Sequence, residues 1–145
     1  MEKTKLIQSL EQGRALFAYQ KAEEAKEQGA EMAKKYKSYV KKVPMLVKNN
    51  GLGAAFAFVK AKGTARNEDG GLSSEKAAYK KIYDDTAEWL RQSPLEFLAK
   101  EKELLEHILS LPSDEYRALT NEVMAFFFWL GRCAEGLIEG EAEND

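Results

Sequence analysis

Residues 41–63 read KKVPMLVKNNGLGAAFAFVKAKG, and their pattern predicts helices. The Asn-Asn-Gly sequence at 49–51 tolerates positive φ and predicts a stop between two helices. The segment 52–62 repeats large apolar residues at three- and four-residue steps, which is typical of a helix with one buried face. Pro44 predicts a further break, because its ring disfavours helical geometry at Val43 and suits the first turn of a new helix. The stretch therefore predicts the end of one helix, a short second helix and a longer third one.

The rest of the chain extends this helical pattern. Glu, Lys, Ala and Leu dominate, Val, Ile and Thr are sparse, and no stretch alternates polar and apolar residues for long enough to form a strand. A chain of 145 residues is a usual size for one domain. We therefore predict an all-α fold, a single-domain bundle of about six helices. The expected helical segments are 3–28, 31–42, 44–47, 52–62, one after Ser73 or Ser74, one from Ser93 to near Leu111, and 114–139.

Three parts of the chain carry more specific expectations. The sequence Ser-Pro-Leu-Glu at 93–96 is a capping box with proline at the first helical position, so a helix is expected to start there. We expect a mobile loop at 63–73 and a flexible acidic tail at 140–145. The last helix has a second apolar side, which we expect in the core, with a partner interface as the alternative; it includes Phe126, Phe128 and Trp129.

The residue types needed for catalysis or metal binding are scarce. His107 is the only histidine and Cys133 the only cysteine, so the sequence offers no Cys/His metal cluster, internal disulfide or histidine-based triad. His107 is expected to pair with Glu103 on a helix surface, and the carboxylates within 84–88 to lie on a solvated face. We expect a protein that is not an enzyme and needs no cofactor or metal. No leader-like segment or long apolar run occurs in the sequence, so we expect a cytoplasmic protein.

Charge is distributed unevenly along a chain whose net charge is only −2. Residues 32–67 contain nine Lys or Arg and no Asp or Glu, although acids outnumber bases in the whole chain. Beyond Arg132 the chain has five acids and no base. Lysine-rich helices are often merely hydrated, but tyrosine and asparagine residues in the same segment supply groups that bind nucleic acids. Binding of a polyanion and head-to-tail association of opposite charges both follow as hypotheses.

Three blocks of the sequence are similar to a known family. They are YKSYVKKVPMLVKNNGLGAAFAF at 36–58, WL at 89–90 and YRALTNEVMAFFFWLGRCAEGL at 116–137. Together they resemble the small helical subunit of the type III-B CRISPR effector, which is called the Cmr complex. The members of this family are the fifth Cmr protein of such complexes. The likeness covers most of residues 14–138.

The resemblance implies a non-catalytic structural subunit that acts in antiviral defence. In that family, several copies stack into a minor filament that lines and clamps the duplex of crRNA and target RNA through its backbone. The implied partners are this RNA, other Cmr subunits including the large polymerase-like subunit, and further copies of the chain, but no membrane. Carried over by position, the RNA-binding residues are Lys41, Lys42, Lys48 and Asn50, with Arg14, Lys60, Lys62 and Arg132 as further candidates.

A second hypothesis keeps the same basic segment and changes its partner. In this alternative the chain is a protein–protein scaffold module whose positive charges contact neighbouring subunits and never touch RNA. A Lys41→Glu, Lys42→Glu double substitution separates the two hypotheses. If the lysines bind RNA, the substitution removes the protection of RNA while the complex assembles normally. If they contact neighbouring subunits, it prevents assembly of the complex.

Overall fold

The computed structural model of the chain describes residues 2–64 and 73–140. All regular elements within these residues are helices, which confirms the all-α prediction. They are α1 (Glu2–Glu27), α2 (Ala30–Asn50), α3 (Leu52–Thr64), α4 (Ser74–Gln92), α5 (Leu104–Ser110) and α6 (Ser113–Leu137). Most of the loop expected at 63–73 and most of the tail expected at 140–145 lie outside the described residues.

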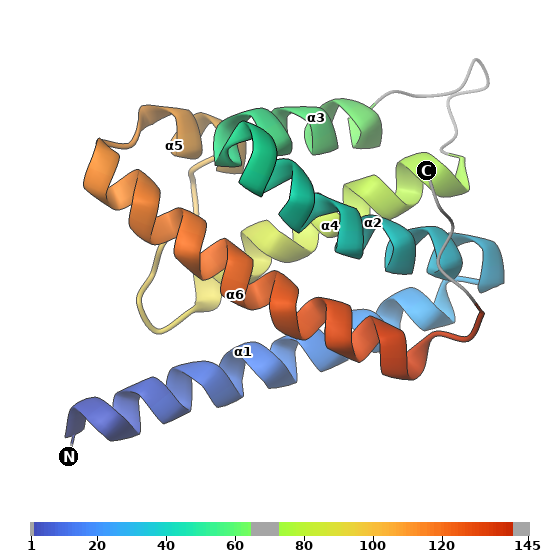
Figure 1. The fold of residues 1–145 in the computed structure, drawn as a ribbon, viewed down its shortest axis with the longest axis horizontal. Coiled ribbons are helices and arrows are strands. Elements are labelled where there is room, and N and C mark those ends of the chain that lie inside the picture. Colours follow the sequence, from blue (N-terminus) through green and yellow to red (C-terminus); the bar gives the residue numbers. More distant parts are fainter. Residues whose placement is uncertain (1, 65–72, 141–145) are drawn as a thin grey trace.

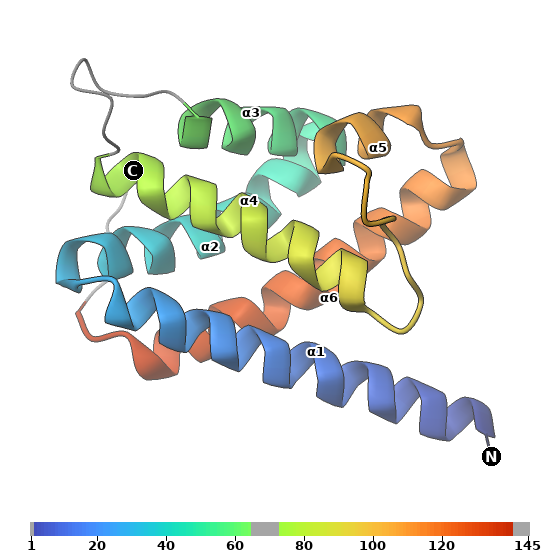
Figure 2. The ribbon, with the colours of Figure 1, turned by 180° about the vertical axis from the view of Figure 1, so that it is seen from behind.

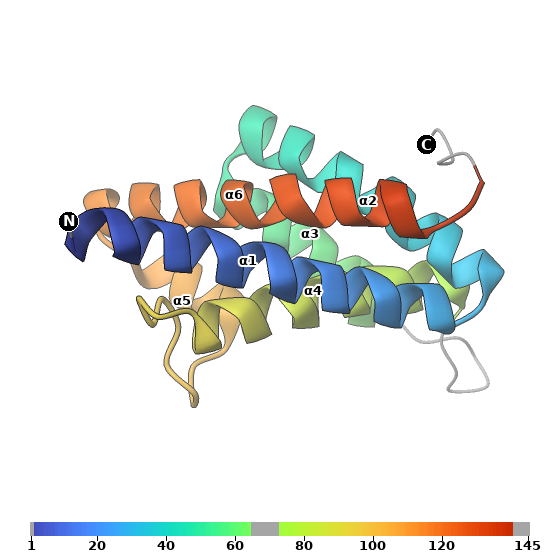
Figure 3. The same cartoon turned by 90° about the horizontal axis from the view of Figure 1, so that it is seen from below.

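The helices are arranged around a core that α2 and α4 cover from opposite sides. In Figure 1, α1 lies along one edge of the bundle with α6 beside it, and α3 and α5 lie along the other edge. Helix α2 crosses the front between α3 and α6, whereas α4 crosses the back, as the reverse view shows (Figure 2). Seen from below, α2 rises above α6 on the front side (Figure 3). One side of α2 therefore packs on the core while the other faces outward.

The core is built largely from aromatic rings on different helices. Phe17, Trp89 and Phe126 surround one another, with ring centroids 5.6, 5.9 and 6.2 Å apart. Tyr39 and Tyr79 stack with their centroids 4.0 Å apart. All five side chains are almost fully excluded from water, and burying a large apolar side chain contributes roughly 1.5–3 kcal/mol. These rings join α1, α2, α4 and α6 into one unit.

Helix α2 continues through Pro44 as one helix, so the predicted break at this residue is wrong. Proline removes one hydrogen bond of the helix and its ring crowds the Val40 carbonyl, but its fixed φ is already helical. Val43 and Val47 on either side of it are 0% and 5% exposed, so core packing holds both turns in one helix. The predicted stop is confirmed at Gly51, which has a φ of 89° and donates its N–H to the Val47 carbonyl at 2.8 Å.

The capping box at 93–96 does not start a helix, because it follows directly on the end of α4. The Glu96 N–H donates to the Ser93 carbonyl at 2.8 Å, and Glu96 adopts a φ of 46°, so the chain turns here. The Leu98 N–H then donates to the Leu90 carbonyl at 3.2 Å, and the Leu98 side chain is buried. This tertiary contact with α4 outweighs the local helix signal, and α5 begins only after it.

Glu103 is the residue that actually starts α5. Its carboxylate accepts hydrogen bonds from the N–H groups of Leu105 at 3.2 Å and Glu106 at 3.0 Å. The Glu103 carboxylate is occupied by these N–H groups, by Tyr83 and by Lys60, and not by His107, with which a surface pair was expected.

Two expectations about exposure are also corrected. Asp84 and Glu88 are exposed as expected, but Asp85 is 3% exposed and accepts a hydrogen bond from the Tyr36 hydroxyl at 2.8 Å. Phe128 was expected in the core and is 54% exposed. The cause lies in helix geometry: successive residues are about 100° apart around the axis, so the residues at 126–128 cannot all face inward.

Candidate nucleic-acid interface

The outward side of α2 carries most of the helix's positive charge. Its inward side consists of buried residues that pack on α4 and α6. On the outward side, Lys41, Met45 and Lys48 follow one another at four- and three-residue steps, and all three are exposed. We call the surface of α2 that bears Lys34, Lys41, Lys42 and Lys48 the basic face of α2; Lys41 and Lys48 are exposed, whereas Lys34 and Lys42 are half-buried. Helix α2 itself lies at the front of the bundle in Figure 1.

One edge of the basic face meets α6. Lys41 forms an ion pair with Glu135, and the two side chains are 47% and 56% exposed. The hydrogen bond from Lys41 lowers the pKa of the Glu135 carboxyl. Exposed pairs contribute little net stability, so a phosphate can replace the carboxylate at small cost. On the same helix, the Arg132 guanidinium lies 5.1 Å from the centre of the Phe128 ring.

The other edge of the basic face meets α3. The ammonium nitrogens of Lys42 and Lys62 lie 5.4 and 5.6 Å from the centre of the Phe58 ring. Lys42 also donates a hydrogen bond to the Tyr79 hydroxyl at 3.5 Å. The negative face of an aromatic ring attracts cations, so Phe58 holds two of the predicted RNA-binding lysines near each other.

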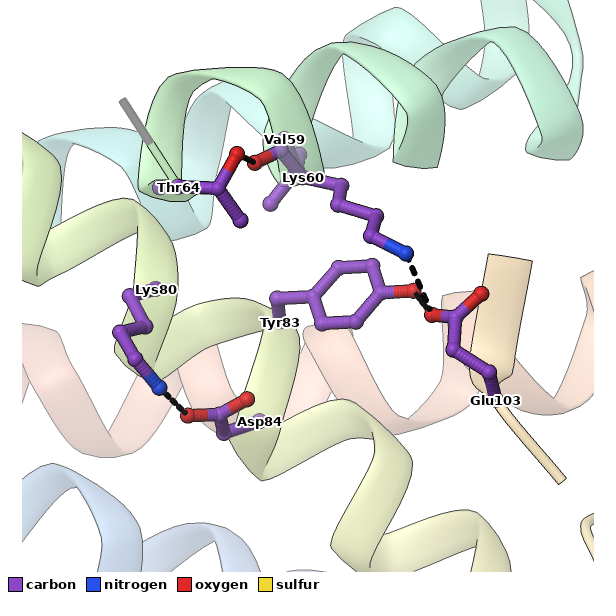
Figure 4. A pocket seen from close by; sticks show the side chains of 8 residues that line it. Val59, Lys60, Thr64, Lys80, Tyr83, Asp84 and Glu103 are labelled. Atoms are coloured by element: carbon purple, nitrogen blue, oxygen red, sulfur yellow. Dashed lines mark hydrogen bonds and ion pairs between the residues drawn. The ribbon is translucent and has the colours of Figure 1, made fainter. Parts of the chain in front are cut away.

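Lys60 lies away from this face, at a cavity of about 260 Å³ between α3 and α4 (Figure 4). Its ammonium group pairs with Glu103 at 3.2 Å, and the Tyr83 hydroxyl also donates to Glu103. Burial raises the pKa of Glu103, but hydrogen bonds from Tyr83, two backbone N–H groups and Lys60 outweigh it and lower the pKa to about 2. Across the cavity, Lys80 pairs with Asp84 at 2.7 Å. Both lysines at this cavity are thus already paired with carboxylates.

Arg14 is placed inside the bundle rather than on the basic face. Its guanidinium donates two hydrogen bonds of 2.7 Å to the Glu122 carboxylate, which also accepts one from Trp89 Nε1 at 2.9 Å. The Arg14 and Glu122 side chains are 12% and 5% exposed. This predicted RNA contact is therefore committed to an internal ion pair that joins α1, α4 and α6.

Three further residues of the basic segment differ in their positions. Lys37 is 5% exposed, and its ammonium group donates to the carbonyls of Ile138 at 3.0 Å and Gly140 at 2.7 Å. It therefore caps the end of α6. Asn50 is exposed as the last residue of α2. Arg66 lies outside the described residues.

Two kinds of site are absent from the described part of the chain. No group of three or more His, Cys, Asp or Glu side chains within residues 2–64 and 73–140 could hold a metal ion. None of the helices described above is long and apolar enough to cross a lipid bilayer.

Comparison with known proteins assigns this helical bundle to a family. The family model described as CRISPR-associated protein (Cas_Cmr5) matches residues 10–137. This chain belongs to the Cmr5 family. The matched range contains the whole basic face of α2 and both helices that flank it.

Two similar proteins support the assignment to Cmr5. A protein from Thermus thermophilus, named CRISPR system Cmr subunit Cmr5, is 34% identical over 125 residues, which are 84% of this chain and 90% of the relative. The crystal structure of a CRISPR-associated Cmr5 family protein from the same species matches with a TM-score of 0.68 and 32% identity. That match covers 90% of this chain and 98% of the other, so the Cmr5 fold extends over nearly the whole bundle.

The surface of this Cmr5 protein includes Phe128, for which the core was the favoured expectation and a partner interface the alternative. Phe128 lies beside Arg132 and is two helical turns before Glu135, so it is on the side of α6 from which Glu135 pairs with Lys41. A signal for this was present in the run of three phenylalanines, because a helix with two flanking neighbours can bury only two of three consecutive side chains.

Proposed function

We propose that this chain is a non-catalytic subunit of the type III-B CRISPR Cmr complex in which the basic face of α2 binds the RNA backbone. Several copies stack into a minor filament along the duplex of crRNA and target RNA, in a cytoplasmic ribonucleoprotein, and clamp the duplex. Phosphate contacts carry no sequence information, so the same surface serves any guide. Membership of the Cmr5 family supports the role in the complex.

The observation that carries the RNA contact is the exposure of lysines on one side of α2. Lys41 and Lys48 are exposed there, and residues 32–64 contain no Asp or Glu. Phosphate binding requires several cations on one face and no particular spacing. Each contact is individually modest, and repetition along stacked copies makes them effective together.

A second candidate function is supported by the Lys41–Glu135 ion pair. Because this pair shows that the basic face accepts a carboxylate from another helix, the same lysines could receive acidic groups from a neighbouring subunit. In this case the chain is a scaffold that holds Cmr subunits together, and RNA is bound elsewhere in the complex.

A double substitution in the assembled complex distinguishes the two functions. Lys41→Glu, Lys42→Glu reverses two charges on the basic face and should leave the subunit composition unchanged while target RNA loses its protection from nuclease. The matched control is Lys5→Glu, Lys100→Glu, which makes the same charge change at exposed lysines outside α2 and should preserve both. Loss of assembly with the α2 variant would favour the scaffold function instead.

A further inference from the structure

Phe128 is an exposed aromatic ring at the edge of a basic surface. Its side chain is 54% exposed, although the Arg132 guanidinium lies 5.1 Å from the ring centre and the Trp129 ring packs edge-on at 5.7 Å. Single exposed apolar side chains are common on protein surfaces, so the charged groups around this ring, and not its exposure alone, indicate a ligand. Arg132 is exposed as well, so the ring and the guanidinium together present one open surface.

The basic face of α2 meets the side of α6 that carries this ring, because Lys41 pairs with Glu135, two helical turns beyond Phe128. Lys37 meets Ile138 near one end of the two helices, and Gly51 lies next to Tyr116 near the other. Helices α2 and α6 therefore run antiparallel, as Figure 1 also shows, and Phe128 falls between these two contacts. From the Lys41–Glu135 pair onward, the exposed residues Lys41, Met45 and Lys48 follow one another along the outward side of α2.

We propose that Phe128 and Arg132 form a stacking platform for an unpaired base of the bound RNA, while Lys48 holds a neighbouring phosphate. This inference rests on the proposed function and adds to it the kind of RNA that the surface prefers. Unpaired bases stack on phenylalanine rings and on guanidinium planes, whereas the bases of a continuous duplex are already stacked on one another. The platform therefore favours a single-stranded or extruded nucleotide over a fully paired one.

The flanking charges favour RNA over a protein partner. Phenylalanine, methionine and arginine are common in protein interfaces, but lysine is depleted there. Exposed lysines flank this ring on the α2 side, and Lys48 makes no ion pair with any of the described residues. A cation with an aromatic ring beside it is the arrangement typical of proteins that bind single-stranded nucleic acids.

Binding of two RNAs by the chain of 145 residues tests this inference. The RNAs are a single strand and a fully paired duplex of equal length, each titrated over a range of salt concentrations. Phe128→Leu keeps an apolar side chain and removes the ring, so affinity for the single strand should fall about tenfold or more, with an unchanged salt dependence. Duplex binding should change less than about twofold. Phe128→Trp is the matched control and should retain single-strand affinity, because it keeps a ring.

Each other outcome has a defined meaning. The stacking platform is overturned if Phe128→Leu leaves the affinity for the single strand unchanged, or lowers the affinities for both RNAs equally. In that case a lower RNA affinity of Lys48→Glu would still support the proposed function. If Phe128→Leu alters self-association in sedimentation while RNA affinity stays the same, the ring belongs to a protein interface, and the inference is also overturned. Failure of the unaltered chain to bind either RNA would overturn the inference together with the RNA-binding function on which it rests.

Discussion

Asp85 is a carboxyl group enclosed by α1, α2 and α4. The Tyr36 hydroxyl donates to it at 2.8 Å and the Lys81 ammonium at 3.1 Å. Lys81 also binds Glu24 at 2.9 Å, and Lys21 on α1 binds Glu24 at 3.3 Å. Burial raises the pKa of Asp85 to about 6, although Lys81, Tyr36 and Lys21 act in the opposite direction. A charge at this position therefore costs more in the folded protein than in water.

Replacement of Asp85 by Asn should remove a pH dependence of stability. The pKa is about 6 in the folded protein against an ordinary value of 3.8, so the folded state binds the proton more tightly. The resulting stabilisation of the folded protein is complete at pH values below the ordinary pKa of 3.8, and it is lost as the pH rises through the folded-state pKa of about 6. Relative to Asp85→Asn, the free energy of unfolding of the unaltered protein should fall by about 3 kcal/mol over this range.

Urea unfolding of both proteins at several pH values measures this difference directly. Asp84→Asn is the matched control, because it makes the same change one residue away at a side chain that is 58% exposed. At each pH, the free energy of unfolding of this control should differ from that of the unaltered protein by less than about 0.5 kcal/mol. A difference between the unaltered protein and Asp85→Asn that does not vary with pH would contradict the account.

Helix boundaries show which local signals survive in the folded chain. The positive-φ stop at Gly51 and the Ser73 cap of α4, whose hydroxyl accepts a hydrogen bond from the Lys76 N–H at 3.3 Å, follow from short-range chemistry and are predictable. The break at Pro44 and the helix start at Ser93 are not, because the packing of the buried valines beside Pro44 and of Leu98 against α4 decides them. Local signals fix a boundary here only where no buried side chain competes with them.

Helix α5 provides the sharpest test at this scale. It has only seven residues, too few for a stable isolated helix, so it depends on its cap and its packing. Glu103→Ala removes the cap and the contacts with Tyr83 and Lys60, and should destabilise the protein by about 1–2 kcal/mol. Hydrogen exchange should accelerate mainly in the amides of α5.

The matched control is Glu106→Ala, in the first turn of the same helix, where the side chain is exposed. It removes a carboxylate without removing the cap and should change stability by less than about 0.5 kcal/mol. Equal effects of the two substitutions would show that the cap at Glu103 does not hold α5 in place.

The candidate site was predictable only in part, because contacts between residues far apart in the sequence decide which charges stay exposed. The basic segment followed from composition and periodicity, and Lys41 and Lys48, seven residues apart, do share the exposed side of α2, whereas Lys42 lies about 100° around the helix and is half-buried. Arg14 could not be placed from sequence, because its partner Glu122 lies 108 residues away. The sequence contains the charges but not the distances that decide which of them remain available.

At the scale of the whole molecule, the Arg14–Glu122–Trp89 cluster joins three helices at one buried point. Glu122→Gln keeps the shape of the side chain and removes its charge. The Arg14 guanidinium is then left buried without a counter-charge, which should cost about 3–5 kcal/mol in the free energy of unfolding. Denaturant unfolding at neutral pH measures this loss.

An exposed ion pair provides the comparison. Lys80→Ala breaks the Lys80–Asp84 pair, in which both side chains are about half exposed, and should cost less than about 1 kcal/mol. A loss for Glu122→Gln as small as this would mean that the buried cluster does not hold α1 against α4 and α6.

The central claim, that the basic face of α2 binds RNA phosphates, is tested most directly by the salt dependence of RNA binding. The comparison is between the unaltered chain of 145 residues and its Lys41→Glu, Lys48→Glu variant, on one single-stranded RNA. The account predicts affinity that falls steeply with salt for the unaltered chain, with a slope of log K against log salt that becomes shallower by about 0.7 for each lost phosphate contact in the variant. An unchanged slope and affinity in the variant would contradict it.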